Sequence, residues 1–151
     1  DYVVRANLMW VATMALNGLI GAGVPQDWST HLIGHEFTAL YGLDHAQTLA
    51  VILPSMMHER RVAKREKLLQ YAERVWNLRD GDDEQRIDAA IENTRAFFET
   101  LGVKTRLKDY GLEQTAVDAA LQQLEQHAMT KLGEHQDIDL AVSRRVLEAS
   151  L

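Results

Sequence analysis

The sequence predicts an all-α domain. Apolar residues recur every three or four positions through most of the chain, which is the spacing of amphipathic helices. No run of strand length alternates apolar and polar residues, and no repeat or low-complexity segment divides the chain. Its 151 residues, 46% of them hydrophobic and 25% charged, can bury a core without the help of a metal or a disulfide. We therefore expect residues 1–151 to form a single helical domain.

Residues 6–24 are the most apolar segment and are expected to form the first helix. Asn7, Thr13 and Asn17 interrupt this segment and glycines crowd its end, whereas a membrane span needs about 20 predominantly apolar residues. A helix that is apolar on nearly every side is instead typical of the buried centre of a larger body. The glycines of residues 18–23 do not have the order of a dinucleotide-binding loop, so we interpret them as the end of this helix.

The second predicted helix runs to about Tyr41. Pro25 opens this stretch, and either Asp27 or Ser29 can cap its start. Gly42 then ends the helix, because glycine readily adopts the left-handed conformation that follows a helix.

The third predicted helix starts at Asp44, which forms a capping-box pattern with Gln47. It continues through Pro54, which is expected to kink it. Apolar positions at helical spacing mark four more helices, the second of which ends at Gly102. These four helices are predicted within residues 68–76, 87–101, 117–124 and 140–147.

Charge and composition exclude several classes of function. Lys and Arg number 16 against 22 Asp and Glu, so the net charge of -6 repels nucleic acids and anionic membranes. The absence of cysteine excludes disulfides, thiolate metal sites and thiol catalysis, and it fits a reducing cytoplasm. The basic residues 60–67 are interpreted as a solvated face, and the acidic residues 80–84 as a helix N-terminus. Because Asp1 opens the chain, we expect it to be part of a longer protein.

Three histidines cluster between residues 31 and 45. At about 100° per residue, His31 and His35 share one face of the second helix with Gly34 and Thr38. The opposite, apolar face carries Ile33, Phe37 and Leu40. His45 follows at the start of the next helix. Three imidazoles and a carboxylate could hold Zn²⁺ or Fe²⁺, since such ions suit imidazole nitrogen. A histidine is more often a packed or surface residue, and the residues alone leave both interpretations open.

The sequence does not match several other metal-binding and catalytic motifs. His35 and Glu36 do not continue into a zincin motif, because Ala39 stands where the second histidine is needed. The chain has neither the Glu-x-x-His pairs of di-iron bundles nor the serine motif of α/β-hydrolases. Asp27, four residues before His31, is a possible carboxylate ligand. The alternatives to an enzyme are therefore a metal module complete in itself, built on Asp27 and the three histidines, and a stand-alone helical interaction module.

The pattern His31-x3-His35-x9-His45, in its context, resembles the C-terminal half of the iron-containing (group III) alcohol dehydrogenases. The segments ALNGLIGAGVPQDW (residues 15–28) and GLDHAQTL (residues 42–49) are similar to the bacterial NADPH-dependent aldehyde reductase and butanol dehydrogenase branch. The resemblance extends over essentially the whole chain. It implies the all-helical C-terminal domain of the dehydroquinate synthase-like fold, without the N-terminal nucleotide-binding α/β domain of that family.

The resemblance also implies roles for the histidines. His31 and His45 match metal ligands, which the family completes with an Asp and a His that have no counterpart here. His35 matches a histidine beside the metal, near the nicotinamide and the substrate. It is expected to relay a proton or to order water or the cofactor. The ion, iron or zinc, would act as a Lewis acid on a small aldehyde. The residues of this chain that touch the nucleotide stay unknown.

The implied parent enzyme is a cytoplasmic homodimer that uses NADP(H). Half of the metal site and the nucleotide-binding domain are expected to lie outside this chain. The chain alone is therefore expected to bind neither the metal nor NADP(H) stably, and to be inactive. Residues 133–137 depart from the family, because they lack the Asn-Pro-Arg that many members carry near this place. This departure leaves the substrate pocket undefined.

Overall fold

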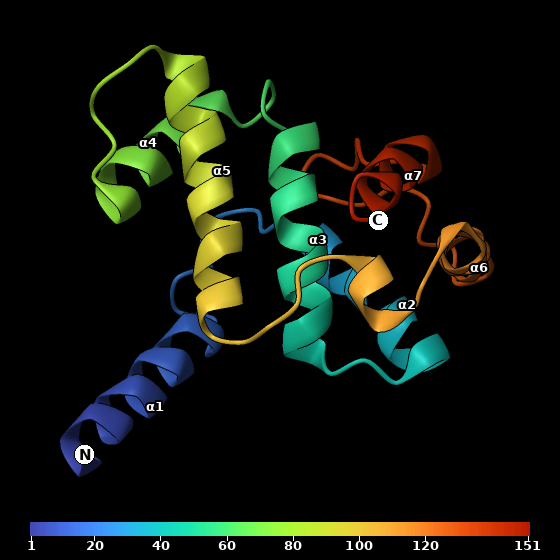
Figure 1. Ribbon diagram of the computed structural model, residues 1–151, viewed down its shortest axis with the longest axis horizontal. Coiled ribbons are helices and arrows are strands. Elements are labelled where there is room, and N and C mark those ends of the chain that lie inside the picture. Colours follow the sequence, from blue (N-terminus) through green and yellow to red (C-terminus); the bar gives the residue numbers. More distant parts are fainter.

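The computed structural model describes residues 1–151 and contains seven α-helices, one 3₁₀ turn and no β-strand (Figure 1). The elements are α1 (Tyr2–Leu16), α2 (Ser29–Tyr41), α3 (His45–Glu59), α4 (Arg65–Trp76), α5 (Asp83–Thr100), the 3₁₀ turn η1 (Leu107–Tyr110), α6 (Gln114–Gln126) and α7 (Leu140–Glu148). The only strand-like pairing is an isolated bridge between Leu132 and Ile138. The prediction of an all-α fold is therefore confirmed.

Helix α3 lies at the centre of the helical body. Helices α2, α5 and α7 pack against α3, α6 packs against α2 and α7, and α4 pairs with α5. In Figure 1, α4 and α5 lie on one side of α3, and α6 and α7 on the other. A small cluster of Leu68, Ile87 and Ile91 joins α4 to α5. The main core is formed by fully buried apolar side chains of α2, α3, α6 and α7, among them Ile33, Phe37, Val51, Ile52, Val117, Leu124, Val146 and Leu147.

Local signals in the sequence set the junction between α2 and α3. Gly42 ends α2 with a φ of 69°, in the left-handed region that glycine adopts at little cost. Helix α3 then begins with a capping box, in which the Asp44 amide donates to Gln47 Oε1 at 2.9 Å. The helix continues through Pro54 to Glu59. The predicted end of α2 at Gly42 and the predicted start of α3 after Asp44 are confirmed.

Helix α1 differs most from expectation. The sequence predicts a helix within residues 6–24 that is buried at the centre of a larger body. Helix α1 spans Tyr2–Leu16, and none of its residues is buried within this chain. Leu8 and Trp10 are 68% and 65% exposed, and the helix projects away from the other helices in Figure 1. A helix that is apolar on every side becomes buried only where other elements surround it, and the other helices of this chain do not surround α1. No helix is long and apolar enough to cross a membrane.

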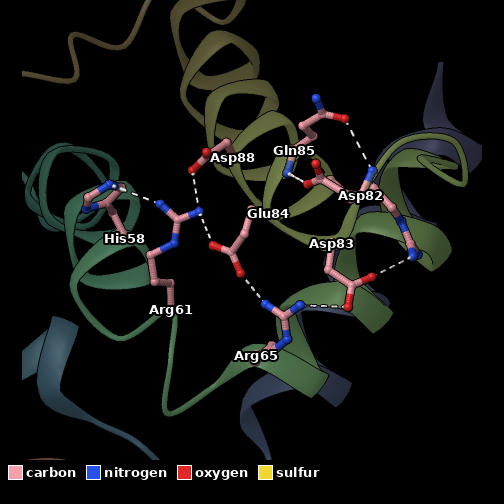
Figure 2. Close-up of polar contacts among 9 residues, drawn as sticks. His58, Arg61, Arg65, Asp82, Asp83, Glu84, Gln85 and Asp88 are labelled. Atoms are coloured by element: carbon pink, nitrogen blue, oxygen red, sulfur yellow. Dashed lines mark hydrogen bonds and ion pairs between the residues drawn. The ribbon is translucent and has the colours of Figure 1, made fainter.

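Ion pairs tie the turn after α3 and the start of α4 to the start of α5 (Figure 2). Arg61 lies between Glu84 and Asp88, with a nitrogen-to-oxygen distance of 2.8 Å to each. Arg65 pairs with Asp83 at 2.7 Å and also with Glu84. The acidic block lies at the N-terminus of α5 as predicted, but the basic block is more than a solvated face. Periodicity reports only neighbours on one helix, so it could not show pairs between separate helices.

Replacing Phe37 tests whether the main core holds α2 in place. Its side chain is fully buried, so Phe37→Ala is expected to lower the free energy of unfolding by about 3–5 kcal/mol, through lost burial and the remaining cavity. Phe97→Ala is the matched control, because the Phe97 side chain is 48% exposed and should lose less than half as much. Urea unfolding followed by circular dichroism measures both changes. Equal losses would contradict this assignment of the core.

Candidate metal centre

The candidate site lies on the outer face of α2. Ile33 and Phe37 are fully buried on the inner face. His35 is exposed, and His31 is partly buried. The predicted division is confirmed for His35 against Ile33 and Phe37. It is wrong for Leu40, which was expected on the apolar face and is 39% exposed, and for Gly34, which was expected on the histidine face and is buried against α3.

Gly34 allows α2 and α3 to approach each other closely. A Cβ atom at this position would lie 2.8 Å from Thr48 Oγ1, closer than side-chain carbons approach other atoms. The Thr48 hydroxyl is buried and donates a hydrogen bond to the carbonyl oxygen of His45 at 2.8 Å. The close crossing brings the first turn of α3, which carries His45, to the histidine face of α2.

The structure gathers the three imidazole rings. The His45 ring centroid lies 5.0 Å from that of His31 and 5.3 Å from that of His35, and the His31 and His35 centroids are 6.4 Å apart. The histidine rings that make polar contacts with side chains are those of His58 and His127. The nitrogen lone pairs of the gathered rings are therefore free to meet a ligand.

The surroundings of His31 favour its neutral form. Burial lowers the pKa of His31, and repulsion from His45 and His35 lowers the pKa further. A metal ion binds the deprotonated nitrogen of a neutral imidazole and competes with a proton for it. The lowered pKa of His31 therefore reduces the competition of protons for its ring nitrogens.

The spacing of His31 and His45 fits two ligands of one ion. Imidazole nitrogens bind such ions at about 2.0–2.1 Å, which places the centroids of two rings on a tetrahedral ion about 5 Å apart. The 5.0 Å between His31 and His45 agrees with this geometry, whereas the 6.4 Å between His31 and His35 exceeds it. No group of three or more His, Asp or Glu side chains is arranged to hold a metal. The three histidines therefore do not form a three-ligand metal site within this chain.

Asp27, the candidate carboxylate ligand, is engaged elsewhere. Its Oδ1 accepts hydrogen bonds from the amide and hydroxyl of Ser29 at 2.9 and 2.5 Å, and its Oδ2 lies 2.6 Å from Lys64 Nζ. The N-cap position of α2 belongs to Trp28, between the two predicted caps. The alternative of a metal module complete through Asp27 is therefore rejected. Asp27 instead fixes the chain at the entrance to α2.

Two ion pairs attach the loop of residues 133–137 to the same region. Lys64 pairs with Glu134 at 2.8 Å in addition to its contact with Asp27, and Arg60 pairs with Asp137. The loop that departs from the family pattern therefore has a structural role. Its ion pairs hold Arg60 at the end of α3 and Lys64, which in turn holds Asp27 before the start of α2.

Two contacts near the site were not predicted. Trp28 packs against the His31 ring in a T-shaped arrangement, with the centroids 5.0 Å apart. Glu36 is buried, and its Oε1 lies 2.9 Å from Nδ1 of His127 at the end of α6. Tryptophan is not a metal ligand, so nothing in the sequence indicated that Trp28 lies at the site. Glu36 and its partner His127 are 91 residues apart in the sequence, so their contact could not be predicted either. The one feature of the sequence that could have indicated a buried contact was the position of Glu36 at the edge of the apolar face of α2.

Comparison with known proteins identifies relatives over the whole chain. The family model described as Fe-containing alcohol dehydrogenase family, C-terminal, matches residues 1–147. The chain is 65% identical over 150 residues to the NADPH-dependent aldehyde reductase YqhD of Escherichia coli strain K12, which covers 99% of this chain and 39% of that protein. The chain therefore spans about two fifths of the length of this relative.

Solved structures agree with this result. The crystal structure of YqhD from E. coli K-12 superposes on the chain with a TM-score of 0.98 at 64% identity, covering 100% of this chain and 39% of that one. The structure of NADH-dependent butanol dehydrogenase A from Thermotoga maritima gives a TM-score of 0.87 at 28% identity, covering 99% and 39%. The fold implied by the sequence resemblance is thereby confirmed.

The contacts of Asp27 predict a pH-dependent contribution to stability. Burial alone would raise the pKa of Asp27, but hydrogen bonds from Lys64 and Ser29 outweigh burial and lower the pKa from 3.8 to about 2. Because the folded pKa is the lower one, the carboxylate stabilises the fold above about pH 4, and this effect is lost as the pH falls towards about 2. Its size is about 2 kcal/mol. Asp27→Asn should remove this contribution at neutral pH and flatten the acid dependence.

Urea unfolding at a series of pH values measures this effect. Asp118→Asn is the control, because Asp118 pairs with Arg144 at the surface, where both side chains are about half exposed. Its loss should stay below about 1 kcal/mol. Parallel pH curves for the wild type and Asp27→Asn would show that Asp27 is not the group responsible.

Proposed function

The chain belongs to the Fe-containing alcohol dehydrogenase family, and we propose that it forms the metal- and substrate-binding part of an NAD(P)H-dependent enzyme that reduces small aldehydes to alcohols. The observation that carries this proposal is the gathering of His31, His35 and His45 at one face between α2 and α3. The name of the E. coli relative, an NADPH-dependent aldehyde reductase, supports the reaction and the substrate class.

In this proposal, His31 and His45 are ligands of one divalent ion, iron or zinc. Their spacing, the lowered pKa of His31 and the Fe-containing family support the assignment. The His35 and His45 rings are also close enough to form a ligand pair, but the family resemblance selects His31. When bound, such an ion supplies Lewis acid chemistry at the carbonyl oxygen of the aldehyde.

His35 is proposed to serve proton transfer. Hydride addition from a nicotinamide turns the aldehyde into an alkoxide, which must take up a proton to become the alcohol. Imidazole is the side chain whose unperturbed pKa lies closest to neutral pH. His35 is exposed on the same face as the ligands, with its centroid 5.3 Å from that of His45. It can therefore give the proton directly or hold the water that gives it.

The remaining parts of the enzyme are proposed to lie outside this chain. The chain supplies two ligands and matches 39% of the E. coli relative, so the other ligands and the nucleotide-binding domain must come from the rest of the protein. The exposed apolar surface of α1 is where we expect that part to pack. We further propose NADP(H) as the cofactor, in line with the name of the E. coli relative, a homodimeric assembly and a cytoplasmic location. The absence of cysteine is compatible with that location.

Substitution of each histidine in the full-length protein separates their roles. His31→Ala and His45→Ala are expected to lose metal and aldehyde reduction together, because each removes a ligand of the ion. His35→Ala is expected to keep the metal while turnover falls by a factor of about 10² to 10⁴, the usual effect of losing a proton-transfer group. Metal content and single-turnover rate are measured on the same preparations.

The other outcomes have defined meanings. Loss of metal in His35→Ala would show that His35 is a ligand and that the assignment of His31 needs revision. Unchanged turnover per folded enzyme would show that His35 only packs. Unchanged metal content and activity in all three variants would support the alternative, an interaction module with incidental histidines.

The isolated chain provides a separate test. Two imidazoles leave most of the coordination to water, so the 151-residue chain is expected to hold no stoichiometric Zn²⁺ or Fe²⁺ after dialysis. It should be helical, because its main core is complete within α2 to α7, and it should reduce no butanal. Metal analysis, circular dichroism and an NADPH oxidation assay check these expectations. Retained metal or turnover would show that the chain contains a complete site.

A further inference from the structure

Trp28 is the aromatic residue in contact with the candidate metal centre. Its ring lies against His31 with the centroids 5.0 Å apart and the planes inclined by 68°. The Trp28 side chain is 42% exposed, so the indole is not a core residue of this chain. Its contact with a predicted ligand therefore needs an explanation other than core packing.

The backbone on both sides of Trp28 is fixed. Asp27 accepts hydrogen bonds from the amide and hydroxyl of Ser29 and pairs with Lys64, and Ser29 is fully buried. Lys64 is in turn held by Glu134. The backbone of Trp28 is therefore held on both sides at the entrance to α2, and its indole lies against His31 in the first turn of that helix.

The His31 ring has no polar contact to fix its orientation. Its ring neighbours are Trp28 and the other two rings of the site, and no side chain donates to or accepts from its nitrogens. A histidine ligand usually needs a neighbour that sets its ring orientation, and loss of such a neighbour weakens metal binding. Trp28 is the neighbour that does not itself belong to the cluster of histidines.

We propose that Trp28 is a positioning residue, whose indole holds the His31 ring in the orientation that lets His31 and His45 share one divalent ion. This inference rests on the proposed function, because it assumes that the two histidines are ligands. An aromatic ring fills the space that the His31 ring would otherwise turn into, so fewer ring orientations compete with the binding one.

Metal titration of the full-length protein tests this role. The metal-free wild type, Trp28→Ala, Trp28→Leu and Trp28→Phe are titrated with Co²⁺ and Zn²⁺. Trp28→Ala and Trp28→Leu are expected to raise the Kd by about tenfold or more and to change the Co²⁺ absorption spectrum, since the His31 ring is no longer held. Trp28→Phe keeps a ring at this position and should stay within about threefold of the wild type. Trp28→Leu keeps apolar bulk, so it separates loss of the ring from loss of packing.

Tyr41→Ala is the matched control. Tyr41 is an aromatic residue at the other end of α2, is 39% exposed, and contacts Phe37 in place of a histidine. Its removal should leave the Kd and the Co²⁺ spectrum unchanged. An equal weakening in Tyr41→Ala would overturn the inference, because a general loosening of α2 would then explain the result.

The outcomes separate this inference from the proposed function. Wild-type binding in both Trp28→Ala and Trp28→Leu overturns the positioning role, while loss of metal in His31→Ala would still support the ligand role. Failure of the wild type to bind either ion, or unchanged binding in His31→Ala, overturns both. A raised Kd in Trp28→Leu with recovery in Trp28→Phe supports the inference even where Trp28→Ala does not fold.

Discussion

Burial of one face of α2 is the constraint on which the candidate site depends. Ile33 and Phe37 are fully buried in the main core, where α2 packs against α3 and α6. Because side chains on a helix point in fixed directions, burial of these two residues leaves the His31 and His35 side of the helix uncovered. Apolar packing thus sets the direction of polar groups that take no part in it. A rotation of α2 that exposed the histidines less would have to expose the core more.

The distance to the third histidine comes from a second constraint, which is the short connection between α2 and α3. Gly42 reverses the chain, and the capping box starts α3 within a few residues. Gly34 then admits the Thr48 side chain at a distance that no other residue type would allow. The turn at Gly42 and the close crossing of α2 and α3 at Gly34 together place His45 beside the two histidines of α2. The geometry of the site therefore follows from glycine positions and apolar packing, without any direct bond among the three rings.

The sequence predicted those parts of the structure that depend on neighbours in the chain. The helical periodicity, the Gly42 end and the Asp44 capping box all act within about one helical turn, so they were visible without the fold. The exposure of α1 in this chain was not predictable, because burial depends on what surrounds the helix. The pairing of Arg61 with Asp88 and of Glu36 with His127 joins different helices, and periodicity carries no information about such contacts.

The candidate site also has features that depend on neighbours in the chain and features that depend on the fold. The spacing of the histidines predicted which residues meet, since they lie on one helix face and the next helix start. The spacing could not predict that Asp27 would be held by Lys64, because that contact depends on the turn between α3 and α4 lying beside the start of α2. The carboxylate closest in sequence to His31 was therefore the wrong candidate ligand. A polar residue near a site belongs to it only if nothing else in the fold satisfies it first.

An incomplete set of ligands has a physical consequence for the proposed enzyme. Two imidazoles bind a divalent ion weakly, whereas four protein ligands enclose it, so most of the binding free energy depends on bringing the two parts of the protein together. The same ion that supplies the Lewis acid chemistry would then stabilise the assembled protein relative to the separated parts. The outward-facing histidines and the uncovered apolar surface of α1 are the two features of this chain that such an assembly would satisfy together. The histidines are polar and directional and the α1 surface is apolar, so in the proposed enzyme the histidines would supply the chemistry and α1 most of the contact area.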